Sequence, residues 1–387
     1  MTRRQSTLLV LLLAAAGCGR DADTPRTAAL SIGELLGGSD TLHARALEPQ
    51  PLRFPEDHGP HPAFRTEWWY FTGNLTAADG RELGYQLTFF RSALTDSLAF
   101  ARLPQERSAW RTRHAYMAHF AVTDARAGEL HAAERFARAA RGLAGATVRP
   151  LRVNLGSWSA ASTGIETFPL RLRASAAEMS IDLVLEYGKP VVAQGENGLS
   201  TKGPEPGNAS YYYSLTRMPT RGTVHIGPTS FDVTGASWLD REWSTSALSA
   251  HLEGWDWMAL QLDDSTELMT YRLRRHDGSA DPFSAATFVA RDGRARALTA
   301  DQFAMTPLDT WRNADGVAYP IAWLVEVPAL DLRLDVAAAA PDQELDLSVR
   351  YWEGMVRVRG TRAGRRVGGR GYLEMTGYVE PPEQIRR

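Results

Sequence analysis

The sequence predicts an all-β protein of many short antiparallel strands, arranged as two similar β-domains in tandem. From Leu52 onward, strand-length runs rich in Trp, Tyr, Phe, Val and Leu are separated by Gly, Asp and Pro, which favour turns. Long helical periodicity is almost absent. A hairpin pattern is also repeated, because the Trp-rich segments at 68–87 and 255–273 each combine a strand, a short turn and a return strand. Chains of this kind form sandwiches or barrels.

Residues 1–17 have the layout of a secretory signal peptide. A basic start precedes an apolar run from Leu8 to Ala16, which is too short to cross a bilayer. The segment that ends at Cys18, the only cysteine, resembles the lipobox of bacterial lipoproteins. That resemblance implies cleavage before Cys18 and its modification by diacylglycerol and palmitate. A plain signal peptide with an incidental cysteine is the alternative. We expect an exported lipoprotein, anchored at the periplasmic face or in the outer membrane of a bacterium.

Composition limits the partners and the source of stability. The formal net charge of −2 becomes more negative once the basic signal segment is removed, which excludes the basic profile of a nucleic-acid-binding protein. One cysteine allows no internal disulfide, so stability must come from buried apolar area. A chain of 387 residues is long enough for two cores of about 150 to 200 residues each.

The chain after the signal peptide divides into a tether and two domains. Residues 18–50 are polar and rich in Ala, Gly and Ser, which is typical of a tether. We expect the N-terminal domain at 51–232 and the C-terminal domain at 233–387. Residues 127–145 depart from the strand pattern, since their Ala, Glu and Arg content predicts a helix.

The segment from Glu67 to Phe71 places four large aromatic residues in a row. Alternate residues of a strand face opposite sides of the sheet, so Glu67, Trp69 and Phe71 share one face. Trp68 and Tyr70 share the other face. A strand with aromatic residues on both faces must meet apolar material on both sides. We therefore expect a barrel interior on one side and an outer layer or partner domain on the other, and either face could carry a ligand.

Five segments carry a resemblance to a known family: "FPEDHGPHPAFRTEWWYFTGNL", "NASYYYSLTRM", "GASWLDREWS", "GWDWMALQLDD" and "YWEGMVRVRG". Together they resemble the carotenoid 1,2-hydratase (hydroxyneurosporene synthase) family and its relatives, the bacterial lipocalin-like lipoproteins. The resemblance runs from Phe54 to Tyr378. It implies two tandem lipocalin-like (calycin) β-barrels and, for the hydratases, addition of water to an alkene without a cofactor.

Such a hydration needs a general acid to protonate the alkene and a wall that tolerates a carbocation. Asp240, Asp256 and Glu67 are the candidate acids, because each is a single carboxyl beside aromatic residues. Two of them also have a structural interpretation. Glu67 would close the barrel end through an arginine, and Asp240 would join the salt bridges of the "WLDREW" segment.

Aromatic residues near these acids are the expected ligand-binding wall. Aromatic faces stabilise cations, but aromatic residues also dominate β-sheet cores, so core packing is the alternative for each of them. The candidates are Trp69, Tyr70, Tyr212, Trp243, Trp255, Trp257 and Tyr271.

His58 and His61 lie close to Asp57 and Glu67, a composition that suggests a metal site. The histidines fall in a loop rich in Gly and Pro, and no second His or Cys cluster completes four ligands. We therefore expect no metal, and a structural role for both histidines at the mouth of the first barrel. The sequence also lacks a G-x-S-x-G nucleophile elbow and a phosphate-binding loop.

These observations favour an envelope lipoprotein that binds or carries an apolar ligand, lipid-like or isoprenoid-like, in or between its barrels. The alternative is a cofactor-independent hydratase that acts on an isoprenoid or carotenoid alkene by general acid catalysis. A third hypothesis is an accessory subunit of an envelope transport system. The expected partners are accordingly an apolar small molecule, the membrane through Cys18 and, for the third hypothesis, a transport protein.

Overall fold

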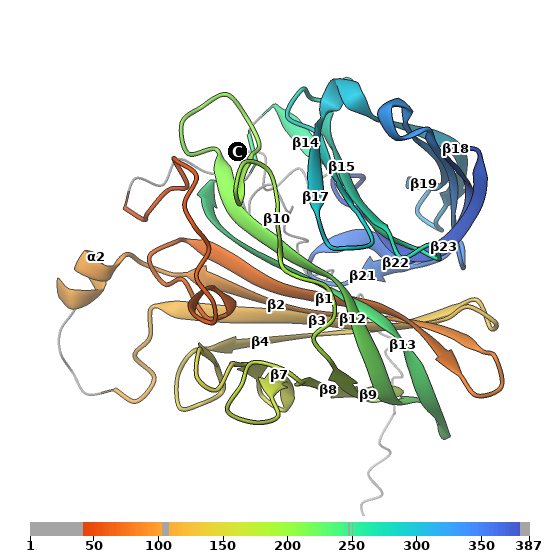
Figure 1. Cartoon of the computed structure of the whole chain (residues 1–387). Coiled ribbons are helices and arrows are strands. Elements are labelled where there is room, and N and C mark those ends of the chain that lie inside the picture. The colour runs from red at the N-terminus through yellow and green to blue at the C-terminus, as the bar shows by residue number, and fades with distance from the viewer. Residues whose placement is uncertain (1–41, 103–107, 247, 250, 380–387) are drawn as a thin grey trace, which may run out of the picture.

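The structure is a computed structural model that describes residues 42–379, apart from 103–107, 247 and 250. The expected signal peptide, Cys18 and most of the tether lie outside these residues. No helix in the described ranges is long and apolar enough to cross a membrane. The described chain forms two antiparallel sheets, one a nearly closed barrel and the other a half-barrel (Figure 1). The prediction of an all-β fold with two tandem barrel domains is confirmed.

The first sheet has the strand order β4-β3-β2-β1-β13-β12-β9-β8-β7-β6-β5, and β10 and β11 pair with β12. It folds over on itself, since β3 and β4 come into contact with β6. Its strands are β1 Thr66–Ala77, β2 Glu82–Ala93, β3 His114–Asp124, β4 Glu129–Arg138, β5 Ala144–Thr147, β6 Arg152–Leu155, β7 Trp158–Ser162, β8 Leu170–Ala176, β9 Met179–Leu185, β10 Val192–Ala193, β11 Leu199–Thr201, β12 Ala209–Ile226 and β13 Thr229–Ser246.

The second sheet has the order β17-β16-β15-β14-β23-β22-β20-β19-β18, and β21 pairs with β22. Its strands are β14 Leu252–Leu262, β15 Glu267–Arg275, β16 Ala285–Val289, β17 Ala295–Thr299, β18 Ala304–Arg312, β19 Ala318–Val327, β20 Leu332–Ala338, β21 Glu344–Asp346, β22 Arg350–Arg362 and β23 Arg365–Met375. Helical structure in the described ranges is short: α2 Ser97–Arg102 and the 3-10 turns η1 Glu56–His58, η2 Ala300–Gln302 and η3 Pro328–Leu330.

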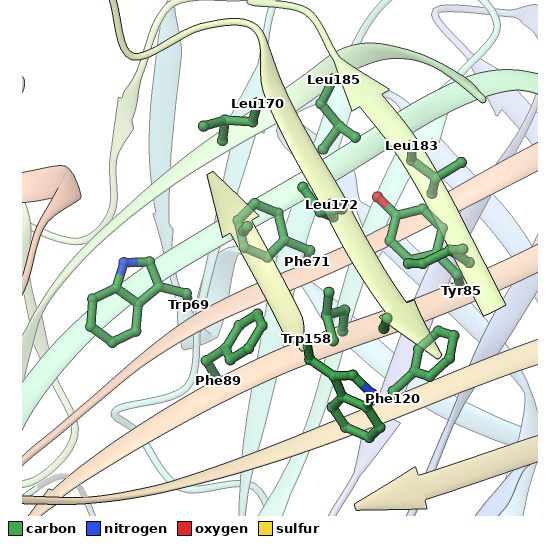
Figure 2. Packing of buried hydrophobic residues seen from close by; sticks show 14 of the residues in the cluster. Trp69, Phe71, Tyr85, Phe89, Phe120, Trp158, Leu170, Leu172, Leu183 and Leu185 are labelled. Carbon is green, nitrogen blue, oxygen red and sulfur yellow. The ribbon is translucent and has the colours of Figure 1, made fainter. Parts of the chain in front are cut away.

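Each sheet encloses its own apolar core. Figure 2 shows Trp69, Phe71 and Phe89 gathered with Trp158 and Leu172 in the first of them. The second core contains alternate residues of β14, β19 and β22. The residues between them lie on the opposite face of the same strands. The two separate cores explain how a chain without an internal disulfide is stabilised.

A third apolar cluster joins the two sheets. Tyr70 of β1 meets Trp257 of β14 edge to face, with ring centroids 5.2 Å apart. Polar contacts reinforce the junction, since Gln261 of β14 donates to the Thr216 carbonyl over 2.7 Å. Glu267 of β15 is fully buried and is 2.7 Å from the ammonium of Lys189 in the first domain. The predicted second layer against the Trp68–Tyr70 face of β1 is therefore the other domain.

The prediction of a helix at residues 127–145 is wrong. Residues 129–138 form β4, which pairs along its whole length with β3, from Asp124↔Glu129 to Ala115↔Arg138. A tight connection with Gly128 at φ 71° makes this hairpin possible. Inter-strand hydrogen bonding at the edge of the sheet thus overrides the helix propensity of the Ala-rich segment. The domain division expected after residue 232 falls inside β13, a strand of the first sheet.

Candidate active site at the domain junction

A cavity of about 100 Å³ lies within the cluster that joins the two sheets. Strand alternation supplies its lining, because the residues of β1 and β14 that do not enter the barrel cores point between the domains. The first-domain wall consists of Trp68, Tyr70, Thr88, Phe90, Met117, His119, Lys202, Tyr212, Asp240 and Glu242. Leu248 follows β13, and the second-domain wall consists of Trp255, Trp257, Tyr271, Leu273, Val349, Tyr351, Glu353 and Glu374.

Asp240 of β13 is a buried carboxyl of the first-domain wall, and its hydrogen bonds come from neutral groups. Its Oδ2 accepts from the Tyr212 hydroxyl over 2.5 Å, and its Oδ1 accepts from Ser214 over 2.5 Å and from Trp238 Nε1 over 2.6 Å. Burial raises the pKa of Asp240 to about 7, although these three hydrogen bonds lower it in part. A carboxyl with this pKa exchanges a proton at neutral pH.

The Tyr212 hydroxyl connects the two walls. It accepts a hydrogen bond from Trp257 Nε1 over 3.2 Å while it donates to Asp240. The second-domain tryptophan therefore fixes the direction of the phenol O–H. This places the ring of Trp257 beside the acid, where an apolar ligand would contact both.

Lys202 is the buried cation of this cavity. Its ammonium is 3.7 Å from a carboxylate oxygen of Glu242 and 4.0 Å from the ring centroid of Tyr271. Burial lowers the pKa of Lys202. The negative charge of Glu242 and the neighbouring Tyr271 raise this pKa by more than burial lowers it, so the net shift is upward. Lys202 therefore stays protonated and balances Glu242.

Two more carboxyls lie on neighbouring strands of the second-domain wall. Glu353 of β22 and Glu374 of β23 are directly opposite in the sheet register. Trp255 Nε1 donates to Glu374 over 2.8 Å. Burial raises the pKa of both carboxyls, and the charge of Glu374 raises that of Glu353 further. Two adjacent buried carboxyls without a neighbouring cation favour their protonated forms.

Glu67, the first predicted acid, lies on the opposite face of β1 and does not line the cavity. It is fully buried and pairs with Arg91 and with Arg241, whose Nη2 is 3.0 Å away. The His61 backbone N–H also donates to it over 2.9 Å. Burial raises the pKa of Glu67, but a hydrogen bond with the His61 side chain and the charges of the two arginines outweigh it and hold the pKa at about 2. This arrangement matches the structural interpretation of Glu67.

Asp256, the other predicted acid, also lies outside the cavity. Arg272 is 2.8 Å and Arg274 is 3.0 Å from its carboxylate oxygens, and the Tyr378 hydroxyl donates to it over 2.8 Å. It faces the barrel side of β14, whereas Trp255 and Trp257 face the cavity. The structure thus places Asp240, and neither Glu67 nor Asp256, at the cavity.

The aromatic residues predicted to form the ligand-binding wall also divide into two groups, two outside the cavity and five that line it. Trp69 is in the first barrel core, where the Arg241 guanidinium lies 3.9 Å from its ring centroid. Trp243 stacks on His61 with ring centroids 3.7 Å apart, near the barrel end. His58 is buried there too, with Nδ1 2.6 Å from the Tyr213 hydroxyl. The remaining candidates line the cavity: Tyr70, Tyr212, Trp255, Trp257 and Tyr271.

Sequence reasoning missed Glu353, Glu374, Lys202 and His119. Glu353 had a usable signal, because "YWEG" places one acid beside two aromatic residues, as "WLDREW" does for Asp240. Lys202 has no aromatic neighbour in sequence, and Glu374 and His119 each have one within two residues, Tyr372 and Phe120. They reach the cavity only through strand pairing and through the packing of the two sheets.

The profile of the AttH-like family matches residues 45–378 of the chain. The chain is 22% identical to kievitone hydratase of Fusarium solani over 221 residues, which are 53% of this chain and 59% of that protein. It is 23% identical to the dehydratase asqC of Emericella nidulans over 181 residues, which are 45% of this chain and 50% of that protein. The chain thus spans about half the length of the curated relatives it matches.

Two crystal structures share the fold. One, from Nitrosomonas europaea and assigned as an AttH, has a TM-score of 0.74 and 34% identity, and the alignment covers 87% of this chain and 100% of that one. Kievitone hydratase from Nectria haematococca has a TM-score of 0.65 and 16% identity, over 88% of this chain and 97% of that one. Because its identity to this chain is only 16%, the similarity to kievitone hydratase shows the fold alone.

Proposed function

We propose that this chain, which belongs to the AttH-like family, is a hydratase or dehydratase that acts on an apolar small molecule between its two domains. The observation that carries the proposal is Asp240, a cavity carboxyl with a pKa raised to about 7 by burial and bound by neutral donors. Two relatives named as a hydratase and a dehydratase support the same reaction class.

Asp240 would transfer the proton that addition or removal of water requires. In hydration, its carboxyl protonates one alkene carbon, the π electrons form the new C–H bond, water adds to the other carbon, and this water loses one of its protons to a carboxylate of the cavity. Dehydration follows the reverse path, with the carboxylate as base. The rings of Tyr70 and Trp257 lie beside this carboxyl and would stabilise developing positive charge. This proton transfer uses side chains alone.

The test is the exchange of water with apolar alkenes and alcohols. The full chain is incubated in ¹⁸O-labelled water with a panel of isoprenoid alkenes, the corresponding alcohols and an apolar cell extract. Mass spectrometry then identifies compounds that gain or lose one labelled water. We expect Asp240→Asn to lower this turnover by about 10²- to 10⁴-fold, because the amide keeps the size of the side chain but cannot transfer the proton.

Asp182→Asn is the matched control, since Asp182 is a half-exposed carboxylate that binds Arg171 on the outside of the first sheet. It should retain wild-type turnover. Full turnover by Asp240→Asn, or no gain or loss of water by the wild type with any compound, would refute the proposal.

A carrier of an apolar ligand is the second candidate, because the aromatic lining of the cavity suits such a ligand. The two functions differ in the fate of the ligand. A carrier that is denatured after purification should release a bound molecule without a second compound that differs from it by one water. A hydratase should yield both compounds, the alkene and the corresponding alcohol. An accessory role in a transport system stays a prediction for which the cavity offers no support.

We also propose that the protein is exported and anchored through Cys18, on the strength of the lipobox resemblance. Cys18→Ala should move the protein from the membrane to the soluble fraction of the producing bacterium. The mass of the wild-type protein should exceed that of the cleaved polypeptide by the acyl groups. An unmodified, soluble wild-type protein would contradict the anchor and leave the enzymatic proposal intact.

A further inference from the structure

Glu353 is a fully enclosed carboxyl at the cavity, with 1% of its surface exposed. Within the described part of the chain, neither of its carboxyl oxygens has a hydrogen-bond partner. The Tyr70 hydroxyl, which is also buried and lines the cavity, has no partner in good hydrogen-bond geometry either, although it and the Tyr351 hydroxyl lie close enough to Glu353 to interact with it. Nearly all buried polar groups in proteins are hydrogen-bonded, so a cavity carboxyl and a phenol that do not meet in good geometry have hydrogen-bonding capacity left for a ligand.

The surroundings of Glu353 favour its neutral form. Burial raises the pKa of Glu353, and the negative charge of Glu374 raises it further, while the nearby phenols of Tyr70 and Tyr351 lower it less. His119 supplies no positive charge, because burial lowers its pKa to about 3. A protonated carboxyl has one O–H to donate and oxygen lone pairs to accept. It can therefore bind a group that is both a donor and an acceptor, such as a hydroxyl.

We propose that Glu353 and Tyr70 form a subsite for a hydroxyl group of the ligand, and that Glu353 supplies the proton with which this hydroxyl leaves as water. The ligand class is an apolar, ring-containing molecule with one hydroxyl directed at the second-domain wall. The proton-donor half of this proposal rests on the proposed hydratase or dehydratase function. The binding half does not depend on it.

The positions of the two acids fit an elimination. Asp240 belongs to β13 of the first domain and Glu353 to β22 of the second, so they lie on opposite walls of one cavity. Tyr70 is the neighbour of Asp240 across the β1–β13 pair, and its phenol approaches Glu353. A ligand between the walls would meet a base at a carbon and an acid at its oxygen.

The reaction balances in both directions. In dehydration, the Asp240 carboxylate removes a proton from carbon, and the C–H electron pair becomes the C=C bond. The C–O bond breaks as Glu353 protonates the oxygen, and water leaves. Asp240 is then protonated and Glu353 ionised, so one proton returns from Asp240 to Glu353, with the Tyr70 hydroxyl next to both. Hydration is the reverse sequence.

The binding half is tested with 2-naphthol and 2-methylnaphthalene, which differ by a hydroxyl in place of a methyl group. We expect the wild type to bind 2-naphthol about tenfold more tightly, the value of one additional hydrogen bond at a buried site. Glu353→Leu should abolish this preference. The same variant should raise the melting temperature of the ligand-free protein, because it removes a buried carboxyl that has no partner in good hydrogen-bond geometry.

Glu326→Gln is the control, since Glu326 is a partly exposed carboxylate that binds Arg333 on β20. It should keep the tenfold preference, and Asp240→Asn should keep it as well. Equal binding of the two compounds by the wild type, binding of neither, or a preference that survives in Glu353→Leu would overturn the subsite. A crystal structure in which only water contacts Glu353 in the presence of 2-naphthol would do the same.

The proton-donor half is tested by infrared spectroscopy without a substrate. At pH 7 the wild type should show the C=O band of a protonated carboxyl that is absent from Glu353→Gln. An ionised Glu353 at this pH would refute its role as proton donor. That result leaves the water-exchange measurement on Asp240→Asn untouched, so failure of this inference and failure of the proposed function are distinguishable.

Discussion

The two faces of the β1–β13 strand pair carry carboxyls of opposite character. On the barrel side, Glu67 of β1 binds Arg241 of β13 and Arg91 of β2. On the cavity side, Asp240 of β13 is held by a phenol, a hydroxyl and an indole N–H. Both groups are almost completely buried, yet the pKa of Glu67 is lowered to about 2 and that of Asp240 is raised to about 7.

Burial therefore does not decide which acid is available for chemistry. It raises both pKa values, and the sign of the net change follows from the charge of the partners. Arginines make Glu67 a permanent anion with a structural role. Neutral donors leave Asp240 able to gain and lose a proton at neutral pH.

The second domain repeats this division. Asp256 of β14 binds Arg272 and Arg274 on the barrel side, whereas Glu353 of β22 faces the cavity without a cation. In each domain, a barrel-side carboxylate bound by arginines thus contrasts with a cavity carboxyl that none of the described arginines binds. The repeated hairpins of the sequence correspond to β1–β2 and β14–β15, which carry the two arginine-bound acids.

Arg241→Ala should give the largest effect on stability. The guanidinium is fully buried, binds Glu67 and the Trp68 carbonyl, and lies over the Trp69 ring. Its removal leaves Glu67 with one arginine fewer in a buried site, so we expect a loss of about 3–5 kcal/mol in the free energy of unfolding. Urea denaturation at pH 7 measures this loss.

Arg173→Ala is the control for that measurement. Arg173 is about half exposed and binds the partly exposed Asp182 at 3.2 Å, so its loss should cost at most about 1 kcal/mol. Equal losses for the two variants would show that the Glu67 cluster does not differ from a surface ion pair.

The pH dependence of stability should separate the two carboxyls by sign. The pKa of Asp240 is 3.8 in the unfolded chain and about 7 when folded, so the folded state binds more protons between these values. Its contribution is present below pH 3.8 and lost as pH rises through 7, with an upper limit of about 4 kcal/mol. The difference in unfolding free energy between wild type and Asp240→Asn should therefore fall from pH 4 to pH 7.

Glu67 should behave in the opposite sense. Its pKa is 4.5 in the unfolded chain and about 2 when folded, so its contribution is present above pH 4.5 and lost as pH falls toward 2. The difference between wild type and Glu67→Gln should shrink over that range. His58, whose pKa burial lowers to about 4, titrates in all three proteins and cancels in the differences. His114, whose pKa burial also lowers to about 4, cancels for Asp240→Asn but not fully for Glu67→Gln, because the Glu67 charge raises the pKa of His114. If the contributions of both carboxyls to the free energy of unfolding changed in the same direction with pH, the contrast between Glu67 and Asp240 would be contradicted.

The family and fold were predictable because they depend on local and repeated patterns. The AttH-like match and the similarity to kievitone hydratase agree with the hydratase resemblance of the aromatic segments. Alternation also predicted correctly that Trp69 and Tyr70 lie on different faces with apolar material on both sides. The edge strand β4 was missed because its sequence alone favours a helix and only its pairing with β3 makes it a strand.

The choice among the acids was not predictable from the sequence. Glu67, Asp240 and Asp256 all lie beside aromatic residues, and the sequence does not state which of them meets an arginine. Arg91 reaches Glu67 across a strand pair, and Tyr212 reaches Asp240 from a strand that begins many residues earlier. The face of the sheet and the long-range partner together set the pKa, and both require the tertiary structure.

Tyr212→Phe should give the smallest effect and test how the neutral donors tune Asp240. The hydroxyl donates to Asp240 over 2.5 Å and thereby stabilises the ionised form. Its loss should raise the pKa of Asp240 further, by about one pH unit, which corresponds to one hydrogen bond of about 1.4 kcal/mol. Carboxyl ¹³C chemical shifts of labelled aspartate, followed against pH, measure the change.

Tyr271→Phe is the matched control, because the Tyr271 hydroxyl contacts Ser200 and not Asp240. An unchanged Asp240 pKa in Tyr212→Phe would mean that the Tyr212 hydrogen bond does not tune it, and the idea that the phenol stabilises the ionised form would then be wrong.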